Sequence, residues 1–342
     1  MLGHSFPTRR SSDLAARAIG DVCIAGVYAP TLAHAERLAA LHGGTAFETL
    51  DGLLDHRPLD LVMIGSPSGL HAEHGIAAAT RGIHVLVEKP IDVTTARADA
   101  LIDAAARGSV TLGVIFQDRL KPDVHKLKTL VDDGRLGRPI LATAQVKWYR
   151  TPEYYAASRW RGKRALDGGG ALMNQGVHTV DLPLWLFGPV QRVFARTAAA
   201  LHRIEVEDTA VAVVEFASGA LGTIEATTAA YPGYARRIEL TGSEGTVVLD
   251  GDRLAAVDLR TAPDHAAADT RDAHDGAPHA TVSASSPVVA DASAHTRVLE
   301  DFIRAMSNRT APMCDGREGR RSVALIEAIY ESARSHQAVE LT

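Results

Sequence analysis

Short β-type runs alternate with amphipathic, helix-length segments from residue 21 to residue 133, and this alternation limits the fold more than any other feature. Leu59–Ile64 is almost continuously apolar, as is typical of a strand buried on both faces. Strands that alternate with helices at this spacing predict a parallel, doubly wound α/β sheet. The expected strands are Val22–Tyr28, Leu59–Ile64, His84–Val87 and Val110–Phe116, and the expected helices are Leu32–His42, Leu70–Thr80, Thr94–Arg107 and Val124–Asp133.

The pattern changes after about residue 137, where β-type runs follow one another with glycine-containing turns between them. Such a succession favours one large, mostly antiparallel sheet in an α+β domain. We therefore expect a dinucleotide-binding domain over residues 15–120 and a substrate-binding and oligomerisation domain over residues 121–342. The runs are Pro139–Tyr149, Gln191–Ala199, Asp208–Phe216, Gly222–Thr227 and Arg236–Thr241, with closing helices at Thr296–Met306 and Arg320–His336 and an expected loop at Ala262–Ala294.

The first fourteen residues do not fit this pattern. His4–Leu14 reads HSFPTRRSSDL, which looks like one reading frame of a common sequencing adapter. We interpret residues 1–14 as an adapter-derived artefact, with a genuine disordered tail as the alternative. The first strand and glycine turn of the doubly wound sheet are then expected to be missing, and the chain is expected to bind dinucleotide poorly.

Charge and cysteine content exclude several classes of protein. A net charge of -5 leaves no basic excess for nucleic acid. Cys23 and Cys314 are the only cysteines, so neither a disulfide framework nor a zinc site is expected. His71 and His74 have metal-like spacing but no further ligands nearby, and we expect no metal. No apolar run reaches the ~18 residues of a membrane span, so a cytoplasmic protein is expected.

Glu88-Lys89-Pro90 directly follows the expected strand His84–Val87. In open α/β sheets, ligands bind outside the carboxyl ends of the strands. A lysine at that edge can donate to a substrate hydroxyl and stabilise a developing alkoxide. The alternative is an ordinary solvated lysine at a strand end. The proline also permits a cis bond after Lys89.

The segment Asp167–Gly188 combines three consecutive glycines with a following helix. Glycines allow close backbone approach, and the helix presents its N-terminus there. Asn174 and His178 are four residues apart, so they share one helix face and form a plausible proton-handling pair. A buried, hydrogen-bonded histidine is the alternative.

Trp148–Gly162 gathers aromatic and arginine side chains in a chain that is otherwise poor in aromatics. Aromatic faces and the forked donors of arginine suit sugars and phosphates. A packed loop that covers the sheet is the alternative.

Together these segments resemble the glucose-fructose oxidoreductase, inositol dehydrogenase and rhizopine catabolism (Gfo/Idh/MocA) family. The resemblance runs from about Ala15 to the C-terminus. Its hallmarks are Ser66-Pro67-Ser68 with His71, Glu88-Lys89-Pro90, and Gly176-x-His178-x-x-Asp181. Within the family, YRTPEYY…WRG…DGGGALMNQGVHTVD looks most like dehydrogenases of nucleotide-linked amino-sugar uronates.

The resemblance implies a Rossmann domain that binds NAD or NADP and an open-faced sheet domain that holds a sugar or nucleotide-sugar substrate. Lys89 would orient the reacting hydroxyl, and His178 would be the general base. Asn174 stands where many members have Asp, so the proton relay can differ. Tyr155 and Arg161 would contact the substrate or the nicotinamide end of the cofactor. The residues that would line the cofactor are Ser66, Pro67, His71, Glu88, Lys89 and Gln117.

The expected function is an NAD(P)-dependent dehydrogenase or reductase of CH–OH groups. The alternatives are an NAD-dependent glycosidase on the same scaffold and a non-catalytic sugar or nucleotide sensor. Ala29 stands where NAD-preferring members usually have an acid, which leaves NAD and NADP both open. The large sheet makes a homo-oligomer plausible.

Overall fold

The computed structural model describes residues 2–3, 15–16, 19–20, 22–260 and 292–341. The chain divides into two compact units. The first comprises residues 1–120, 163–168 and 287–323, and the second comprises residues 121–162, 169–286 and 324–342. A division at residue 120 therefore separates the two folds only in part, because two later segments return to the first unit. The expected loop at residues 262–294 lies mostly outside the described residues.

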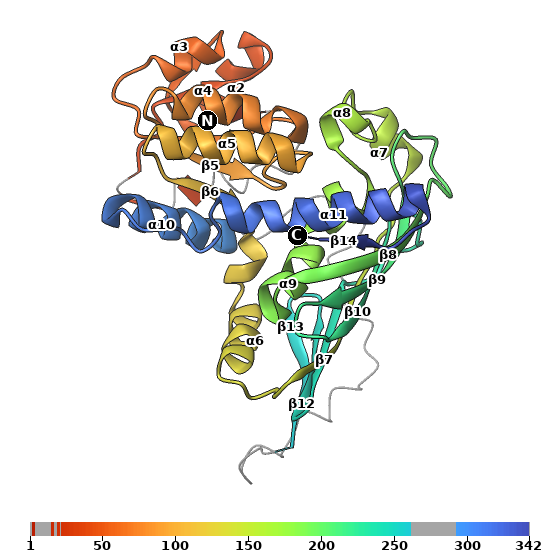
Figure 1. Ribbon diagram of the computed structural model, residues 1–342. Helices are drawn as coiled ribbons and strands as arrows, with labels where there is room; N and C mark the ends of the chain where they lie inside the picture. The colour runs from red at the N-terminus through yellow and green to blue at the C-terminus, as the bar shows by residue number, and fades with distance from the viewer. Residues whose placement is uncertain (1, 4–14, 17–18, 21, 261–291, 342) are drawn as a thin grey trace. The chain divides into compact units, whose positions relative to one another are not determined.

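In its described part, the first unit contains a six-stranded sheet whose neighbouring strands are all parallel, in the order β3-β2-β1-β4-β5-β6 (Figure 1). This is the predicted doubly wound sheet. Its strands are β1 (Leu2–Gly3), β2 (Gly26–Tyr28), β3 (Thr45–Phe47), β4 (Leu61–Gly65), β5 (His84–Glu88) and β6 (Leu112–Ile115). Its helical segments are α2 (Leu32–His42), α3 (Leu50–Leu54), η2 (Ser68–Leu70), α4 (His71–Ala79), α5 (Thr95–Arg107), η3 (Gln117–Leu120), α8 (Arg164–Asp167), α10 (Ser293–Asn308) and the first part of α11 (Gly316–Ser335).

The central strands of this sheet are buried on both faces. Val85 and Val87 of β5 have no exposed surface, and Leu86 between them is only 1% exposed. Leu86 packs in one cluster with Leu299 and Phe302 of α10. Because successive strand residues point to opposite faces, the continuous apolar run of β5 is what a sheet covered on both sides requires.

Strand β1 corrects one expectation. Leu2–Gly3 pairs with β2 on one side and β4 on the other, so a two-residue strand fills the position where the sequence predicted none. Apolar and polar residues are mixed without alternation after Leu2–Gly3, so the sequence showed no strand pattern in this region. The segment 4–14, whose sequence contains no glycine, lies outside the described residues, so the expected absence of the glycine turn stays a prediction.

The second unit contains, in its described part, an eight-stranded sheet in the order β13-β12-β11-β7-β10-β9-β8-β14. Only the pair β7 and β10 is parallel among the strand pairs described, so the sheet is mostly antiparallel, as predicted. Its strands are β7 (Pro139–Lys147), β8 (Val190–Ala198), β9 (Thr209–Phe216), β10 (Leu221–Thr227), β11 (Arg237–Gly242), β12 (Gly245–Asp250), β13 (Arg253–Leu259) and β14 (Val339–Glu340). Its helical segments are α6 (Pro122–Asp132), α7 (Pro152–Ala156), the π-helix η4 (Ala171–Gly176), α9 (Val177–Phe187) and the remainder of α11.

The two faces of the large sheet differ in burial. Ala210, Ala212 and Val214 of β9 are almost completely buried. Val211 and Val213, which point the other way along the same strand, are 50% and 52% exposed. The sheet therefore has one packed face and one open face.

Several short elements were not predicted, among them β3, α3, β12 and β13. Thr45–Phe47 is too short to show an alternation, and its pairing with β2 is what makes it a strand. β13 reads RLAAVDL, which does not alternate between apolar and polar residues and so gives no strand pattern, and none of its residues is fully buried. Among the described helices, none is long and apolar enough to cross a membrane.

Candidate active site

The expected cofactor residues lie at the carboxyl-terminal edge of the parallel sheet. Ser66 and Pro67 follow β4, Lys89 follows β5, and Gln117 follows β6. The strand order reverses between β1 and β4, where Gly3 pairs with Gly65. Ligands of open α/β sheets bind at such a reversal. We therefore expect a dinucleotide at this edge of the sheet.

Lys89 is half-buried, and its peptide bond to Pro90 is cis, as the sequence permitted. The segment after it is held by Asp92, whose side chain is fully buried. The Asp92 carboxylate accepts hydrogen bonds from the Ala72 backbone N–H at 2.8 Å and from Arg97 Nε at 2.7 Å. These bonds fix the position of the segment that carries Lys89. The sequence reasoning missed Asp92, because its burial, which requires such partners, is visible only in the folded chain.

His71 is fully buried and joins two strand ends. Its Nδ1 lies 2.7 Å from the Pro90 carbonyl oxygen, and its Nε2 lies 2.9 Å from the Ser66 carbonyl oxygen. The ring has no exposed surface for a ligand. We therefore expect His71 to act on a cofactor only through Ser66 and Pro90, not by the direct contact inferred from the sequence.

Asn174 and His178 are the two partly exposed residues of an otherwise buried segment. From Gly169 to Leu184, every described residue except these two is buried. Asn174 lies in the π-helix η4, and His178 lies in the first turn of α9. The backbone N–H groups of Asn174 and Gln175 both point to the Gly170 carbonyl oxygen at 3.3 Å, which widens this turn. The predicted side-by-side placement of an amide and an imidazole is thus compatible with the burial pattern.

Glu207 holds the start of this π-helix. Its carboxylate accepts hydrogen bonds from the backbone N–H groups of Gly170 at 3.1 Å and Leu172 at 2.8 Å, and from Tyr330 Oη at 2.9 Å. Burial raises the pKa of Glu207, while these donors act in the opposite direction. Glu207 therefore satisfies backbone donors that would otherwise be orphaned at the start of a helix.

The glycine run is explained by this anchor. A Cβ atom at Gly169 would lie 2.0 Å from Tyr330 Oη, and one at Gly170 would lie 1.9 Å from the Glu207 carbonyl oxygen. Both contacts are far below van der Waals distance. The glycines thus allow close approach of the protein's own residues, and the helix start that we expected to face a ligand is occupied by Glu207.

A network of arginine, glutamine and tyrosine adjoins Asn174. Arg150 is buried and donates from Nε and Nη2 to Gln175 Oε1, at 3.1 and 2.8 Å. Gln175 Nε2 in turn donates to Asn174 Oδ1 and to Tyr154 Oη, both at 2.9 Å. Because the Asn174 side-chain oxygen accepts this hydrogen bond from Gln175, the NH₂ group of the Asn174 amide is oriented as a donor. Burial lowers the pKa of Arg150.

Tyr154, and not Tyr155, faces this network. Tyr155 is only 8% exposed, its hydroxyl lies 2.9 Å from Thr228 Oγ1, and its ring packs on His202. The Arg161 guanidinium carbon lies 4.1 Å from the centroid of the Tyr154 ring. We therefore keep Arg161 as a candidate substrate residue and assign Tyr155 to packing. The sequence could not separate two adjacent tyrosines, because the outcome depends on which way α7 faces.

Known proteins share both halves of this arrangement. Residues 7–116 match the family described as "Oxidoreductase family, NAD-binding Rossmann fold", and residues 124–248 match the "GFO/IDH/MocA C-terminal domain". D-xylose 1-dehydrogenase (NADP(+)) 2 of Haloferax volcanii is 30% identical over 300 residues, which cover 87% of this chain and 85% of that protein. The chain belongs to the GFO/IDH/MocA family. This GFO/IDH/MocA protein is an NAD(P)-dependent oxidoreductase, as its motifs predicted.

Two solved structures are similar to this GFO/IDH/MocA protein over its whole length. The WlbA dehydrogenase from Bordetella pertussis, in complex with NADH and UDP-GlcNAcA, has a TM-score of 0.87 and 32% identity, and the match covers 100% of this chain and 96% of that one. The WlbA dehydrogenase from Chromobacterium violaceum, with the same two ligands, has a TM-score of 0.86 and 30% identity, with 100% and 94% covered.

Exchange of Glu207 for glutamine tests the anchor of η4. The new amide NH₂ cannot accept from the Gly170 or Leu172 backbone, so we expect the free energy of unfolding to fall by about 1–3 kcal/mol. Because η4 carries Asn174, we also expect kcat of the folded variant to fall while the KM for NAD(P) stays unchanged. Thermal and chemical denaturation with steady-state kinetics measure both effects.

Tyr330→Phe is the matched control, since it removes one donor and leaves the carboxylate in place. We expect it to cost about 1 kcal/mol and to leave kcat nearly unchanged. A folded Glu207→Gln variant with wild-type kcat would show that Glu207 stabilises the fold without positioning Asn174.

Proposed function

We propose that this oxidoreductase transfers hydride between NAD(P) and a hydroxyl-bearing or keto carbon of an anionic, nucleotide-linked sugar. The observation that carries the proposal is the accessible pair Asn174 and His178 beside the Arg150–Gln175 network. A proton acceptor and an amide donor on one open face suit a reacting hydroxyl. Bound NAD(P) would supply the hydride acceptor or donor.

Each protein residue has a defined role in this proposal. Lys89 donates a hydrogen bond to the reacting oxygen and stabilises the charge that develops on it. His178 takes the hydroxyl proton during oxidation and returns it during reduction. Asn174 donates from its amide to the sugar and thereby orients it. Glu88, Ser66, Pro67 and Gln117 border the cofactor at the edge of the parallel sheet.

The charge near Asn174 supports an anionic substrate. Arg150 and Arg161 both stack on the Tyr154 ring, with guanidinium carbons 5.4 and 4.1 Å from its centroid. Arginine binds carboxylates and phosphates with two parallel hydrogen bonds. A uronate linked to a nucleoside diphosphate presents both groups. The similarity to WlbA, which was crystallised with UDP-GlcNAcA, supports the same class.

Turnover of defined sugars tests this function. The full chain is incubated with NAD⁺ or NADP⁺ and either UDP-GlcNAcA or uncharged UDP-GlcNAc, and the absorbance of the reduced nicotinamide is recorded. We expect turnover of the uronate and much weaker turnover of UDP-GlcNAc. Hydrolysis without net change of the cofactor would instead indicate a glycosidase. Binding without any reaction would indicate a sensor.

We further propose that the chain is a homo-oligomer that buries the open face of its large sheet. Phe194 of β8 pairs with Val213 of β9, and the two are 46% and 52% exposed. Leu221 of β10 pairs with Leu141 of β7, and these are 54% and 43% exposed. Exposed apolar side chains in adjacent strands form a contiguous patch, which is typical of an interface.

Exchange of Val213 for lysine should therefore dissociate the oligomer. A charge in the centre of an apolar interface is desolvated without a partner. We expect sedimentation to give a smaller mass for Val213→Lys than for the wild type. Leu41→Lys, at a 60% exposed position of α2, is the control and should keep the wild-type mass. A monomeric wild type would contradict the proposal.

We place this activity in the cytoplasm, where NAD(P) is available. Cell fractionation with an activity assay checks this assignment.

A further inference from the structure

The two ring nitrogens of His71 both face carbonyl oxygens, inside a fully buried site. Nδ1 lies 2.7 Å from the Pro90 oxygen, and Nε2 lies 2.9 Å from the Ser66 oxygen. A carbonyl oxygen can only accept a hydrogen bond, so both nitrogens must carry a proton for both bonds to form. A neutral imidazole has one N–H and one lone pair, and that lone pair would be directed at a carbonyl oxygen. The geometry therefore favours the doubly protonated, positively charged ring.

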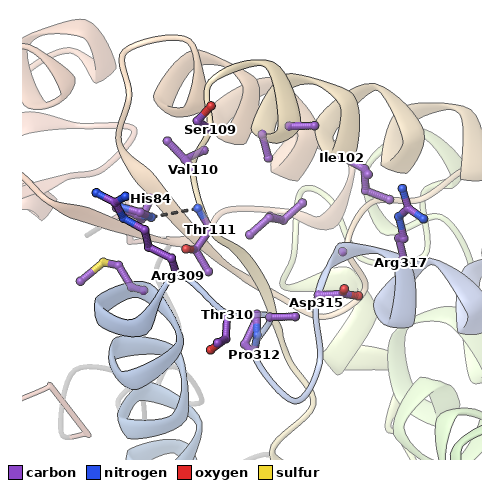
Figure 2. A pocket seen from close by; sticks show the side chains of 16 residues that line it. His84, Ile102, Ser109, Val110, Thr111, Arg309, Thr310, Pro312, Asp315 and Arg317 are labelled. Carbon is purple, nitrogen blue, oxygen red and sulfur yellow. Dashed lines mark hydrogen bonds between the residues drawn. The ribbon is translucent and has the colours of Figure 1, made fainter.

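Two other histidines of the same unit show what the neutral form requires. His84, the first residue of β5, lines a pocket at the opposite edge of the sheet, and its Nδ1 accepts from the Thr111 backbone N–H at 2.9 Å (Figure 2). His74 Nδ1 lies 3.1 Å from Ser66 Oγ, a hydroxyl that can donate or accept. Burial lowers the pKa of both rings. Neither set of partners requires a charged ring, whereas both partners of His71 are acceptors.

A buried cation needs compensation by negative charge. His71 is the first residue of α4, where the positive end of the helix dipole by itself disfavours a cation. The fully buried Asp92, two residues after Pro90, offsets this, because its carboxylate accepts from the Ala72 backbone N–H in the first turn of α4 at 2.8 Å. Arg97 shares that carboxylate, but its side chain is 43% exposed and therefore partly solvated.

The other charged groups of this region do not oppose a charged His71. On the elements around it, the charged side chains are Glu73 of α4, Glu88 and Lys89 at the end of β5, and Arg164 and Asp167 of α8, which packs against η2. Three of these are acids and two are bases, so as a group they add no excess of positive charge. Asp167 is only 1% exposed, which makes it a second buried acid of this region.

We propose that His71 is a positioning residue that stays protonated through neutral pH and joins the ends of β4 and β5. Its charge-assisted bonds fix the carbonyl of Ser66, after β4, relative to that of Pro90, which follows Lys89. They also bring a fixed positive charge to the edge where we expect the dinucleotide, whose pyrophosphate is anionic. The role rests on the proposed function, in which these two segments carry Ser66 and Lys89.

NMR of the full chain with ¹⁵N-labelled histidine tests the protonation state. We expect one imidazole ring to keep both N–H groups up to about pH 8.5, where ordinary histidine is neutral. This signal should be missing in His71→Gln, and the ring of His74 should show a single N–H at neutral pH. If His71→Gln fails to fold, the wild-type spectrum still decides, because the absence of any doubly protonated ring at that pH would overturn the proposal.

The affinity for NADH, measured by fluorescence, tests the role at the cofactor edge. Glutamine at position 71 is neutral and presents its oxygen to one of the two carbonyls, so we expect the Kd for NADH to rise about tenfold. His125→Gln, at an exposed position of α6, is the matched control and should keep the wild-type Kd. Unchanged NADH affinity in His71→Gln would overturn the role. Both measurements omit the sugar, so their failure is distinct from a failure of the proposed reaction.

Discussion

Exchange of Lys89 for methionine is expected to reduce kcat/KM about 10²–10³-fold. Methionine keeps the length and apolar stem of the side chain but cannot donate to the reacting oxygen. The Asp92 bonds to Ala72 and Arg97 hold this segment through other residues, so the fold should be unaffected. We therefore expect the thermal midpoint and the affinity for NADH, measured by fluorescence, to stay close to wild type.

Lys126→Met provides the matched control. Lys126 lies on α6, and its side chain is 69% exposed in an ion pair with Asp123. Exposed pairs of this kind contribute little, so neither activity nor stability should change. Wild-type turnover of Lys89→Met would remove Lys89 from the catalytic residues, and an equal loss in Lys126→Met would show that the assay reports charge in general.

Exchange of His178 for alanine is expected to lower kcat about 10²–10⁴-fold, because the hydroxyl loses its proton acceptor. His178 is partly exposed at the start of α9, so the smaller side chain leaves no large buried cavity. The remaining rate should increase with pH, since hydroxide must then remove the proton. Steady-state rates across a pH series measure both effects.

His125→Ala is the control for this second experiment. His125 is exposed on α6, and we expect the variant to keep the wild-type rate and pH profile. If His178→Ala keeps its rate, His178 is not the proton acceptor, and a loss of rate in Asn174→Ala alone would then reflect orientation of the substrate, because an amide is not a base.

The glycine run shows how a correct motif can be given the wrong physical reason. The sequence showed that the backbone must approach something closely at Gly169 and Gly170. It did not show that the neighbours are Tyr330 and Glu207, which lie far along the chain. A glycine reports only that space is short, and tertiary packing decides what fills it.

Periodicity predicted the two sheets because their central strands carry their own evidence. β5 is apolar on both faces, and β9 alternates between buried and exposed residues, so each reveals its environment locally. β1 and β3 are too short to carry such a pattern. They are strands because β2 and β4 provide hydrogen-bonding partners, which no local window of sequence contains.

Sequence alone determined the α/β architecture, the family and the candidates Lys89, Asn174 and His178, since motif spacing and side-chain periodicity are local properties of the chain. Tertiary structure decided that Tyr154 faces the arginines while Tyr155 is buried. It placed the His71 ring between the carbonyl oxygens of Ser66 and Pro90. It also decided that Glu207 and Asp92 hold the segments that carry the candidates. These relations join residues far apart in sequence, and only the packing of the folded chain creates them.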